Sequence, residues 1–145
     1  MRTPEQVKWD FVQQWLTKAH QDVSVAQLLL ENELEGYETV GFHAQQAVEK
    51  FMKAFLVRYQ IEFPKTHNIS MLRELVSKVD QKLSQQLMSM EVLTAYGVEY
   101  RYPGAYDPIS QKQGREALDL AEQACDLIML KLESYVKAGR PGGSK

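Results

Sequence analysis

The sequence has little of what disulfide frameworks and metal sites require. Its 145 residues include one cysteine and three histidines. Cys125 cannot form an internal disulfide, and it lies in an apolar helical pattern that indicates a buried, inert thiol. The histidines are too widely spaced to predict a metal site. We therefore expect neither a metal nor another cofactor, and a reducing compartment, the cytoplasm, as the location.

Long apolar runs and an excess of positive charge are also missing. No run approaches the roughly 18–20 residues that span a bilayer, and the N-terminus MRTPEQVKWDF lacks the apolar core of a signal peptide. The formal net charge is −2, from 17 basic and 19 acidic residues. These features argue against a membrane protein and against a surface that attracts nucleic acid everywhere, but they allow a local basic patch.

Prolines are few, and long segments of helix-forming residues separate them. No stretch alternates apolar and polar residues over the length of a strand. Apolar spacings of three and four predict helices over about 4–33, 37–59, 69–79, 82–100 and 111–136. The sequence thus predicts an all-α fold, an antiparallel up-and-down bundle of about five helices that is similar to a four-helix bundle. We expect a single domain over 1–137 and a disordered tail over 138–145.

The predicted helices each have an apolar stripe. For the first helix the stripe is Phe11, Trp15, Ala19, Val23, Ala26 and Leu30, and for the third it is Met71, Leu72, Leu75 and Val76. In the second helix Ala44, Val48, Phe51, Met52 and Phe55 share one side. We expect these stripes to face the core of the bundle.

The other side of the second predicted helix is the first candidate site. It carries His43, Gln46, Lys50 and Lys53, where two cations and two hydrogen-bonding groups could hold phosphate or base edges. The alternative is a solvated face whose histidine caps or bridges to a neighbour. Small residues on this side would also allow another helix to approach closely.

The loop PKTHN, residues 64–68, is the second candidate site. Lys65 and His67 stand just before a predicted helix N-terminus, where backbone N–H groups and the helix dipole favour anions. The alternative is ordinary capping by Thr66 and Asn68.

The stretch EYRYPGAYDP, residues 99–108, is the third candidate site. Arg101 ends a predicted helix among tyrosines, and an arginine beside Tyr102 can clamp a phosphate while the ring stacks on a base. The alternative is that Pro103 and Gly104 end the helix and the tyrosines pack at a corner. A phosphate pocket requires that Arg101 and the polar side of the second helix face a common cavity.

Several segments, taken together, resemble the HEPN family (higher eukaryotes and prokaryotes nucleotide-binding domains). They are FHAQQAVEKFMKAFLV at 42–57, FPKTHNI at 63–69 and VEYRYPG at 98–104, and WLTKAHQDVSVAQLLL at 15–30 is similar to the family's first helix. The resemblance covers about residues 9–136. It implies a helical bundle that commonly dimerises and that acts beside a small nucleotidyltransferase, frequently as a toxin–antitoxin pair.

The resemblance also raises the question of catalysis. Many family members are metal-independent ribonucleases that use an arginine with a histidine shortly after it, but no histidine follows His67 in this sequence. We therefore predict a cytoplasmic dimer that binds a nucleotide, RNA or a nucleotidyltransferase partner, with no catalytic residue assigned. The predicted binding residues are His43, Gln46, Lys50, Lys53, Lys65, His67, Arg101 and Tyr102. Two alternatives stay open: an endoribonuclease toxin with an altered motif, and a non-catalytic dimerisation module.

Overall fold

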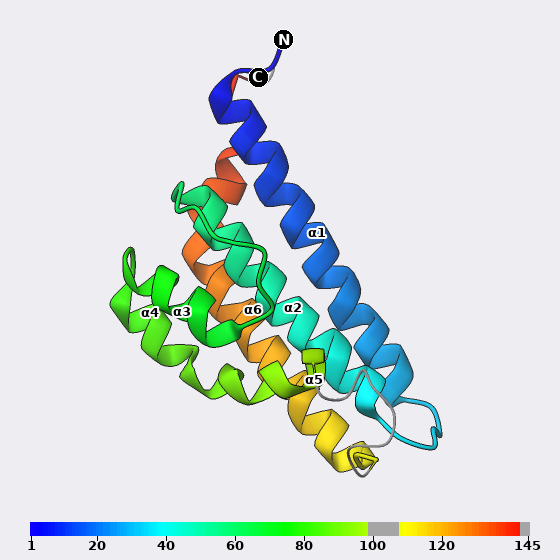
Figure 1. Ribbon diagram of the computed structural model, residues 1–145. Helices are drawn as coiled ribbons and strands as arrows, with labels where there is room; N and C mark the ends of the chain where they lie inside the picture. Colours follow the sequence, from blue (N-terminus) through cyan, green and yellow to red (C-terminus); the bar gives the residue numbers. More distant parts are fainter. Residues whose placement is uncertain (99–107, 143–145) are drawn as a thin grey trace.

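The computed structural model describes residues 1–98 and 108–142 (Figure 1). These residues form six α-helices and one 3-10 helix and contain no β-strand. The elements are α1 (Pro4–Leu30), α2 (Glu38–Arg58), α3 (Ile69–Ser77), α4 (Gln81–Gln86), the 3-10 helix η1 (Met88–Leu93), α5 (Thr94–Val98) and α6 (Gln111–Ala138). The predicted all-α bundle is confirmed.

Helix α2 is the centre of the bundle. It packs against α1, α3, α5 and α6, and it runs antiparallel to α1 (Figure 1). Thirteen of its 21 residues are buried, so α2 is enclosed on more than its apolar side. The predicted apolar side is confirmed, since Ala44, Val48, Phe51, Met52 and Phe55 are all buried.

The two longest helices, α1 and α6, begin with the same N-terminal capping box. At the start of α1, Thr3 Oγ1 accepts a hydrogen bond from the backbone N–H of Gln6, and Gln6 Oε1 accepts one from the backbone N–H of Thr3. Ser110 and Gln113 make the same reciprocal pair at the start of α6. An N-cap of this kind stabilises a helix by about 1 kcal/mol.

Two predicted core positions are wrong. The buried residues of α1 are Val12, Leu16, Ala19, Asp22, Ala26 and Leu30, whereas Phe11 is 49% exposed. Met71 on α3 is exposed as well. Apolar residues occupy two adjacent faces in each of these helices, and periodicity alone does not say which face the bundle covers.

The prediction of one continuous helix over 82–100 is also wrong. The chain forms α4, η1 and α5 in turn. Leu87, Met90 and Leu93 are buried at a spacing of three, which suits the three residues per turn of a 3-10 helix. The predicted end of that helix at Tyr100 lies outside the described residues.

The residues that follow α6 return to the start of α1. Arg140 Nε donates to Asp10 Oδ1 at 3.0 Å, and Gln6 Nε2 donates to the carbonyl oxygen of Pro141 at 2.9 Å. Hydrogen bonds from Arg140 and then Arg2 lower the pKa of Asp10 to about 2. Arg140 and Pro141 therefore lie beside the N-terminal end of α1, where Figure 1 shows the described end of the chain after α6.

Candidate functional site

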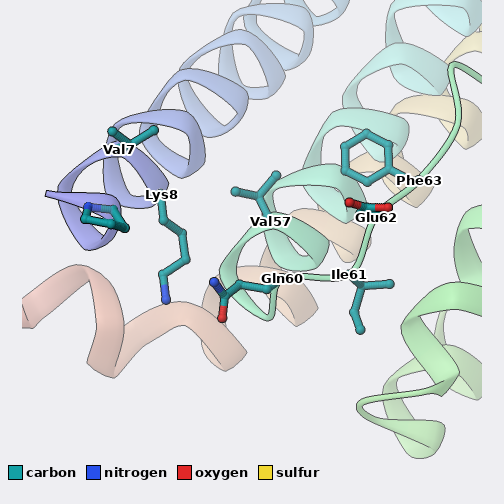
Figure 2. A pocket seen from close by; sticks show the side chains of 8 residues that line it. Val7, Lys8, Val57, Gln60, Ile61, Glu62 and Phe63 are labelled. Atoms are coloured by element: carbon teal, nitrogen blue, oxygen red, sulfur yellow. The ribbon is translucent and has the colours of Figure 1, made fainter. Parts of the chain in front are cut away.

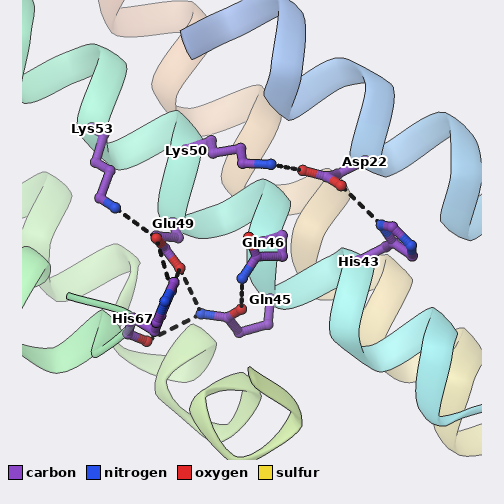
Figure 3. A network of polar contacts seen from close by, with 8 residues as sticks. All are labelled: Asp22, His43, Gln45, Gln46, Glu49, Lys50, Lys53 and His67. Atoms are coloured by element: carbon purple, nitrogen blue, oxygen red, sulfur yellow. Dashed lines mark hydrogen bonds and ion pairs between the residues drawn. The ribbon is translucent and has the colours of Figure 1, made fainter. Parts of the chain in front are cut away.

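The polar side of α2 holds two buried carboxylates, Asp22 from α1 and Glu49 from α2 itself. Each carboxylate accepts a hydrogen bond from one lysine and contacts one histidine (Figure 3). We refer to them by their acids, as the Asp22 cluster and the Glu49 cluster.

The Asp22 cluster, formed by Asp22, His43 and Lys50, joins α1 to α2. Lys50 Nζ donates to Asp22 Oδ2 at 2.6 Å, and His43 Nδ1 lies 2.8 Å from Asp22 Oδ1. His43 and Lys50 are two turns apart, which places them on the same face of α2. An ionised carboxylate can only accept, so a neutral His43 ring carries its proton on Nδ1 and leaves Nε2 as an acceptor. The His43 side chain remains 24% exposed.

The Glu49 cluster, formed by Glu49, Lys53 and His67, lies deeper. Lys53 Nζ donates to Glu49 Oε1 at 2.6 Å, and His67 Nδ1 lies 3.0 Å from Glu49 Oε2. The side chains of Glu49 and Lys53 are 3% and 8% exposed, whereas that of His67 is 54% exposed. Lys53 Nζ also lies 5.2 Å from the centre of the Trp15 ring and 5.7 Å from that of Phe63. These rings supplement the single carboxylate in stabilising the buried ammonium group.

Two glutamines connect the Glu49 cluster to α5. Gln46 Nε2 donates to Gln45 Oε1 at 2.7 Å, and Gln45 Nε2 donates to Glu49 Oε2 at 3.0 Å and to the His67 carbonyl oxygen at 3.1 Å. Helix α5 lies directly against this pair, because a Cβ atom on Gly97 would come within 2.8 Å of the Gln45 side chain. A glycine at that position permits the close approach.

The loop before α3 combines capping with a contact to Glu49. Thr66 Oγ1 accepts a hydrogen bond from the backbone N–H of Asn68, and Asn68 Oδ1 accepts one from that of Met71. Asn68 is therefore the N-cap of α3, as the capping alternative expected, whereas the Thr66 contact is a turn two residues long that caps no helix. His67 lies between these residues but contacts Glu49 on α2 instead.

The structure brings together five of the eight predicted binding residues: His43, Gln46, Lys50, Lys53 and His67. Lys65 is exposed in the loop between α2 and α3. Arg101 and Tyr102 lie outside the described residues, so the common cavity of Arg101 and α2 stays a prediction.

Each cluster is electrically balanced while its histidine is neutral. Lys50 and Lys53, which the sequence suggested as phosphate-binding cations, each donate to a carboxylate. Such pairing is what offsets the desolvation of charges in a protein interior. Protonation of His43 or His67 would add one positive charge to its cluster and convert Nε2 into a donor. The arrangement can therefore hold two oriented imidazole rings, each beside a buried ion pair of lysine and carboxylate.

Sequence reasoning missed Asp22, Gln45 and Glu49. Asp22 interrupts the buried stripe of α1 between Ala19 and Ala26, and a charged residue in such a stripe signals a buried partner. Glu49 stands four residues before Lys53, the spacing of a helical ion pair. The burial of the Lys53 side chain does not fit the solvated-face alternative, whereas the contact of His43 with Asp22 fits its expectation of a histidine that bridges to a neighbour.

A separate groove lies between the start of α1 and the end of α2 (Figure 2). It has a volume of about 560 Å³ and is lined by Pro4, Val7, Lys8, Val57, Gln60, Ile61, Glu62 and Phe63. Its charged side chains among the described residues, Lys8 and Glu62, are of opposite sign, and none of the six predicted binding residues that the structure describes lines it. The groove thus offers no concentration of positive charge for a phosphate.

Cys125 lies on α6 and belongs to neither cluster. Burial raises the pKa of the Cys125 thiol to about 11, and the carboxylates of Asp126 and Glu122 add to the effect; a thiol of this kind is a poor nucleophile.

Within residues 1–98 and 108–142, no group of three or more His, Cys, Asp and Glu side chains is placed to hold a metal ion. No helix in this part of the chain combines the length and apolar character that crossing a membrane requires.

Comparison with known proteins identifies the family. The family model of the HEPN domain matches residues 12–132, a span that contains both clusters and all eight predicted binding residues. No curated protein and no solved structure gives a match to the chain. A HEPN domain indicates a function related to nucleotides or RNA, and domains of this kind often dimerise. The chain belongs to the HEPN domain family.

Proposed function

We propose that this HEPN protein binds a phosphate-bearing ligand, RNA or a nucleotide, on the polar side of α2. The observation that supports the proposal most is the fixing of both histidines by buried carboxylates. His43 Nδ1 lies 2.8 Å from Asp22 and His67 Nδ1 lies 3.0 Å from Glu49, while both rings stay partly exposed. A histidine held in this way presents its other nitrogen to a ligand in a set orientation.

The burial of Glu49 and Lys53 supports a role beyond stability. Replacing a buried ion pair by apolar residues of similar volume is often neutral or stabilising. Ionisable side chains that are kept in such surroundings cluster at functional sites. The two clusters also share one side of α2, where a single extended ligand could contact both.

The proposed contacts follow from the chemistry of each group. Protonated His43 and His67 donate to phosphate oxygens, and charge-assisted hydrogen bonds of this kind are among the strongest in proteins. Lys65, which is exposed, adds a cation at the His67 end. The other proposed contacts are Gln46 with a base edge, Arg101 with a phosphate and Tyr102 stacked on a base.

We further propose that the protein acts in the cytoplasm with a small nucleotidyltransferase as its partner, in a toxin–antitoxin pair. Membership of the HEPN family supports this proposal. The test is co-expression with a nucleotidyltransferase encoded beside it, followed by copurification and growth measurements. A stable complex that relieves growth inhibition is expected, and two proteins that neither copurify nor alter each other's effect on growth would contradict it.

A second candidate function is metal-independent RNA cleavage, favoured by the His67–Glu49 pair. A carboxylate that orients a histidine is the arrangement used by general bases, and here the oriented ring is more than half exposed. His67 would take the proton of a ribose 2′-hydroxyl as that oxygen attacks the adjacent phosphorus. The bond from phosphorus to the 5′-oxygen of the next nucleotide breaks, the 5′-oxygen takes a proton from water, and a 2′,3′-cyclic phosphate remains. Incubation with end-labelled RNA in EDTA tests it: cleavage that His67→Ala abolishes supports it, and intact RNA excludes it while leaving binding open.

The binding proposal is tested by fluorescence anisotropy of labelled single-stranded RNA, with ATP as a second ligand. We expect saturable binding that His43→Ala and His67→Ala each weaken severalfold. His20→Ala is the matched control, because the His20 ring packs on Phe51 and makes no contact with either cluster. If neither RNA nor millimolar ATP gives a saturable signal, the proposal fails and the non-catalytic dimerisation module is favoured.

A further inference from the structure

A chain of hydrogen bonds fixes the direction in which the Gln45 side chain faces (Figure 3). Gln45 Nε2 lies 3.0 Å from Glu49 Oε2 and 3.1 Å from the carbonyl oxygen of His67. A carboxylate and a carbonyl oxygen only accept hydrogen bonds, so both contacts require the amide nitrogen of Gln45 at that end. Both of its amide protons are then used, and Gln45 is fully buried.

The orientation of Gln45 determines that of Gln46. Because the nitrogen of Gln45 is turned to Glu49 and His67, its Oε1 faces Gln46, and Gln46 Nε2 donates to that oxygen at 2.7 Å. Fixing the nitrogen of the planar Gln46 amide fixes its oxygen as well. The residues that the structure describes give Gln46 this one hydrogen bond, through Nε2, and none through Oε1.

The fixed amide oxygen stands on the polar side of α2, between the two clusters. Gln46 lies one turn from His43 and one turn from Lys50, so the three share a face of the helix. Gln46 is partly exposed, whereas the Gln45 that holds it is buried. An acceptor held in this way is preorganised, because its side chain loses little rotamer freedom when a ligand donates to it.

We infer that Gln46 Oε1 accepts a hydrogen bond from the amino group of a nucleic-acid base and so selects against uracil. The inference rests on the proposed binding of RNA or a nucleotide. Cytosine has an N4 amino group where uracil has the acceptor O4, and adenine and guanine carry amino groups as well. Uracil O4 would place one acceptor against another, and uracil N3–H lies between two carbonyl oxygens that repel Oε1.

The selectivity depends on the buried neighbour as much as on Gln46 itself. A glutamine with an unrestrained side chain can turn its amide to present either the oxygen or the nitrogen, and it then serves cytosine and uracil equally. Gln45 removes that choice. Gln46 is therefore the specificity-determining residue, and Gln45 is a positioning residue that acts through it.

Fluorescence anisotropy with labelled oligo(C) and oligo(U) of equal length tests the inference. The two ligands have the same backbone and the same ring size, so phosphate contacts largely cancel in the ratio of their dissociation constants. We expect the wild type to bind oligo(C) about five to ten times more tightly than oligo(U). A second comparison, of ATP with purine riboside triphosphate, which lacks the amino group, tests the same contact with a free nucleotide.

The outcomes separate this inference from the proposed function. A preference in the RNA comparison supports selection within RNA, and a preference in the ATP comparison alone supports the contact with a free nucleotide. Equal affinities in both comparisons overturn the inference and leave the binding proposal standing. Failure of all four ligands to bind overturns both.

Two variants separate the roles of the glutamines. Gln46→Met removes the acceptor and should bring the ratio near one by weakening the binding of oligo(C). Gln45→Met lets Gln46 turn and should lower the ratio by strengthening the binding of oligo(U), which a mere loss of packing would not do. Gln123→Met, at an exposed position on α6, is the matched control and should keep the wild-type ratio. A ratio that Gln46→Met leaves unchanged overturns the inference, even where the buried Gln45→Met variant fails to fold.

Discussion

The Asp22 and Glu49 clusters contain the same three kinds of side chain but differ in depth and in what they connect. The Asp22 cluster links two helices, and the side chains of its lysine and its histidine are 21% and 24% exposed. In the Glu49 cluster the acid and the lysine come from consecutive turns of α2 and are almost fully buried, and the histidine comes from an exposed loop.

This difference assigns different roles to the two acids. A buried carboxylate and ammonium depend on each other, because neither can reach water when the other is removed. Lys50 and His43 can turn toward solvent when Asp22 is lost. Glu49 should therefore matter most for stability and Asp22 less, while both should orient a histidine.

The largest effect is expected for Glu49→Gln. The substitution leaves Lys53 buried without a counter-charge and should lower the free energy of unfolding by about 3–5 kcal/mol. Urea denaturation followed by circular dichroism measures it. The double variant Glu49→Gln/Lys53→Met removes both charges and should recover most of the lost free energy of unfolding. A Glu49→Gln variant as stable as the wild type would contradict the burial of the pair.

A smaller effect is expected for Asp22→Asn. Its partners lose a charged acceptor but retain access to water, so the free energy of unfolding should fall by about 1.5–3 kcal/mol. Asp119→Asn, at an exposed position on α6, is the control and should change stability little. A loss for Asp22→Asn as large as that for Glu49→Gln would remove the distinction between the clusters.

The third prediction concerns the tautomers of the histidines. Because Asp22 and Glu49 accept from Nδ1, neutral His43 and His67 should both carry their proton on that nitrogen. Long-range ¹H–¹⁵N NMR correlations of the imidazole rings measure the tautomer. Glu49→Gln should disturb the spectrum of His67 and leave that of His43 unchanged, whereas an Nε2–H tautomer for either ring would contradict the observed contacts.

The last prediction concerns Cys125, an ionisable group outside both clusters. Its pKa of about 11 implies that native protein at pH 8 reacts with iodoacetamide on the order of 100-fold more slowly than unfolded protein. The folded-state pKa lies above the ordinary value of 9.0. The contribution of the protonated thiol to the free energy of unfolding is therefore fully present below pH 9 and is lost as the pH rises toward 11. Equal alkylation rates for native and unfolded protein would contradict the protection of the thiol.

The sequence predicted the bundle better than it predicted which faces the bundle covers. The apolar side of α2 was predicted correctly because Phe51, Met52 and Phe55 lie on one face of the helix. For α1, Phe11 and Val12 both fit an apolar stripe, and the docking of α2 decides between them. The sequence signal for the break in the 82–100 segment was the spacing of three between Leu87, Met90 and Leu93. This spacing is compatible with an α-helix as well as with a 3-10 helix, so it did not predict the break.

Only part of the candidate site was predicted, because periodicity describes one helix at a time. The spacing of His43, Lys50 and Lys53 places them on one side of a single helix, which periodicity describes well. Asp22 and His67 come from other elements, and their contacts depend on how those elements pack in three dimensions. A local pattern therefore identified the cations but not the carboxylate from α1 that balances one of them.

The most direct test of the central claim is the RNA dissociation constant of the wild type and of the double variant His43→Ala/His67→Ala. If both histidines contact phosphate on the polar side of α2, the double variant should bind RNA markedly more weakly than either single variant, and His20→Ala should bind as the wild type does. A double variant that binds RNA as tightly as the wild type would contradict the claim.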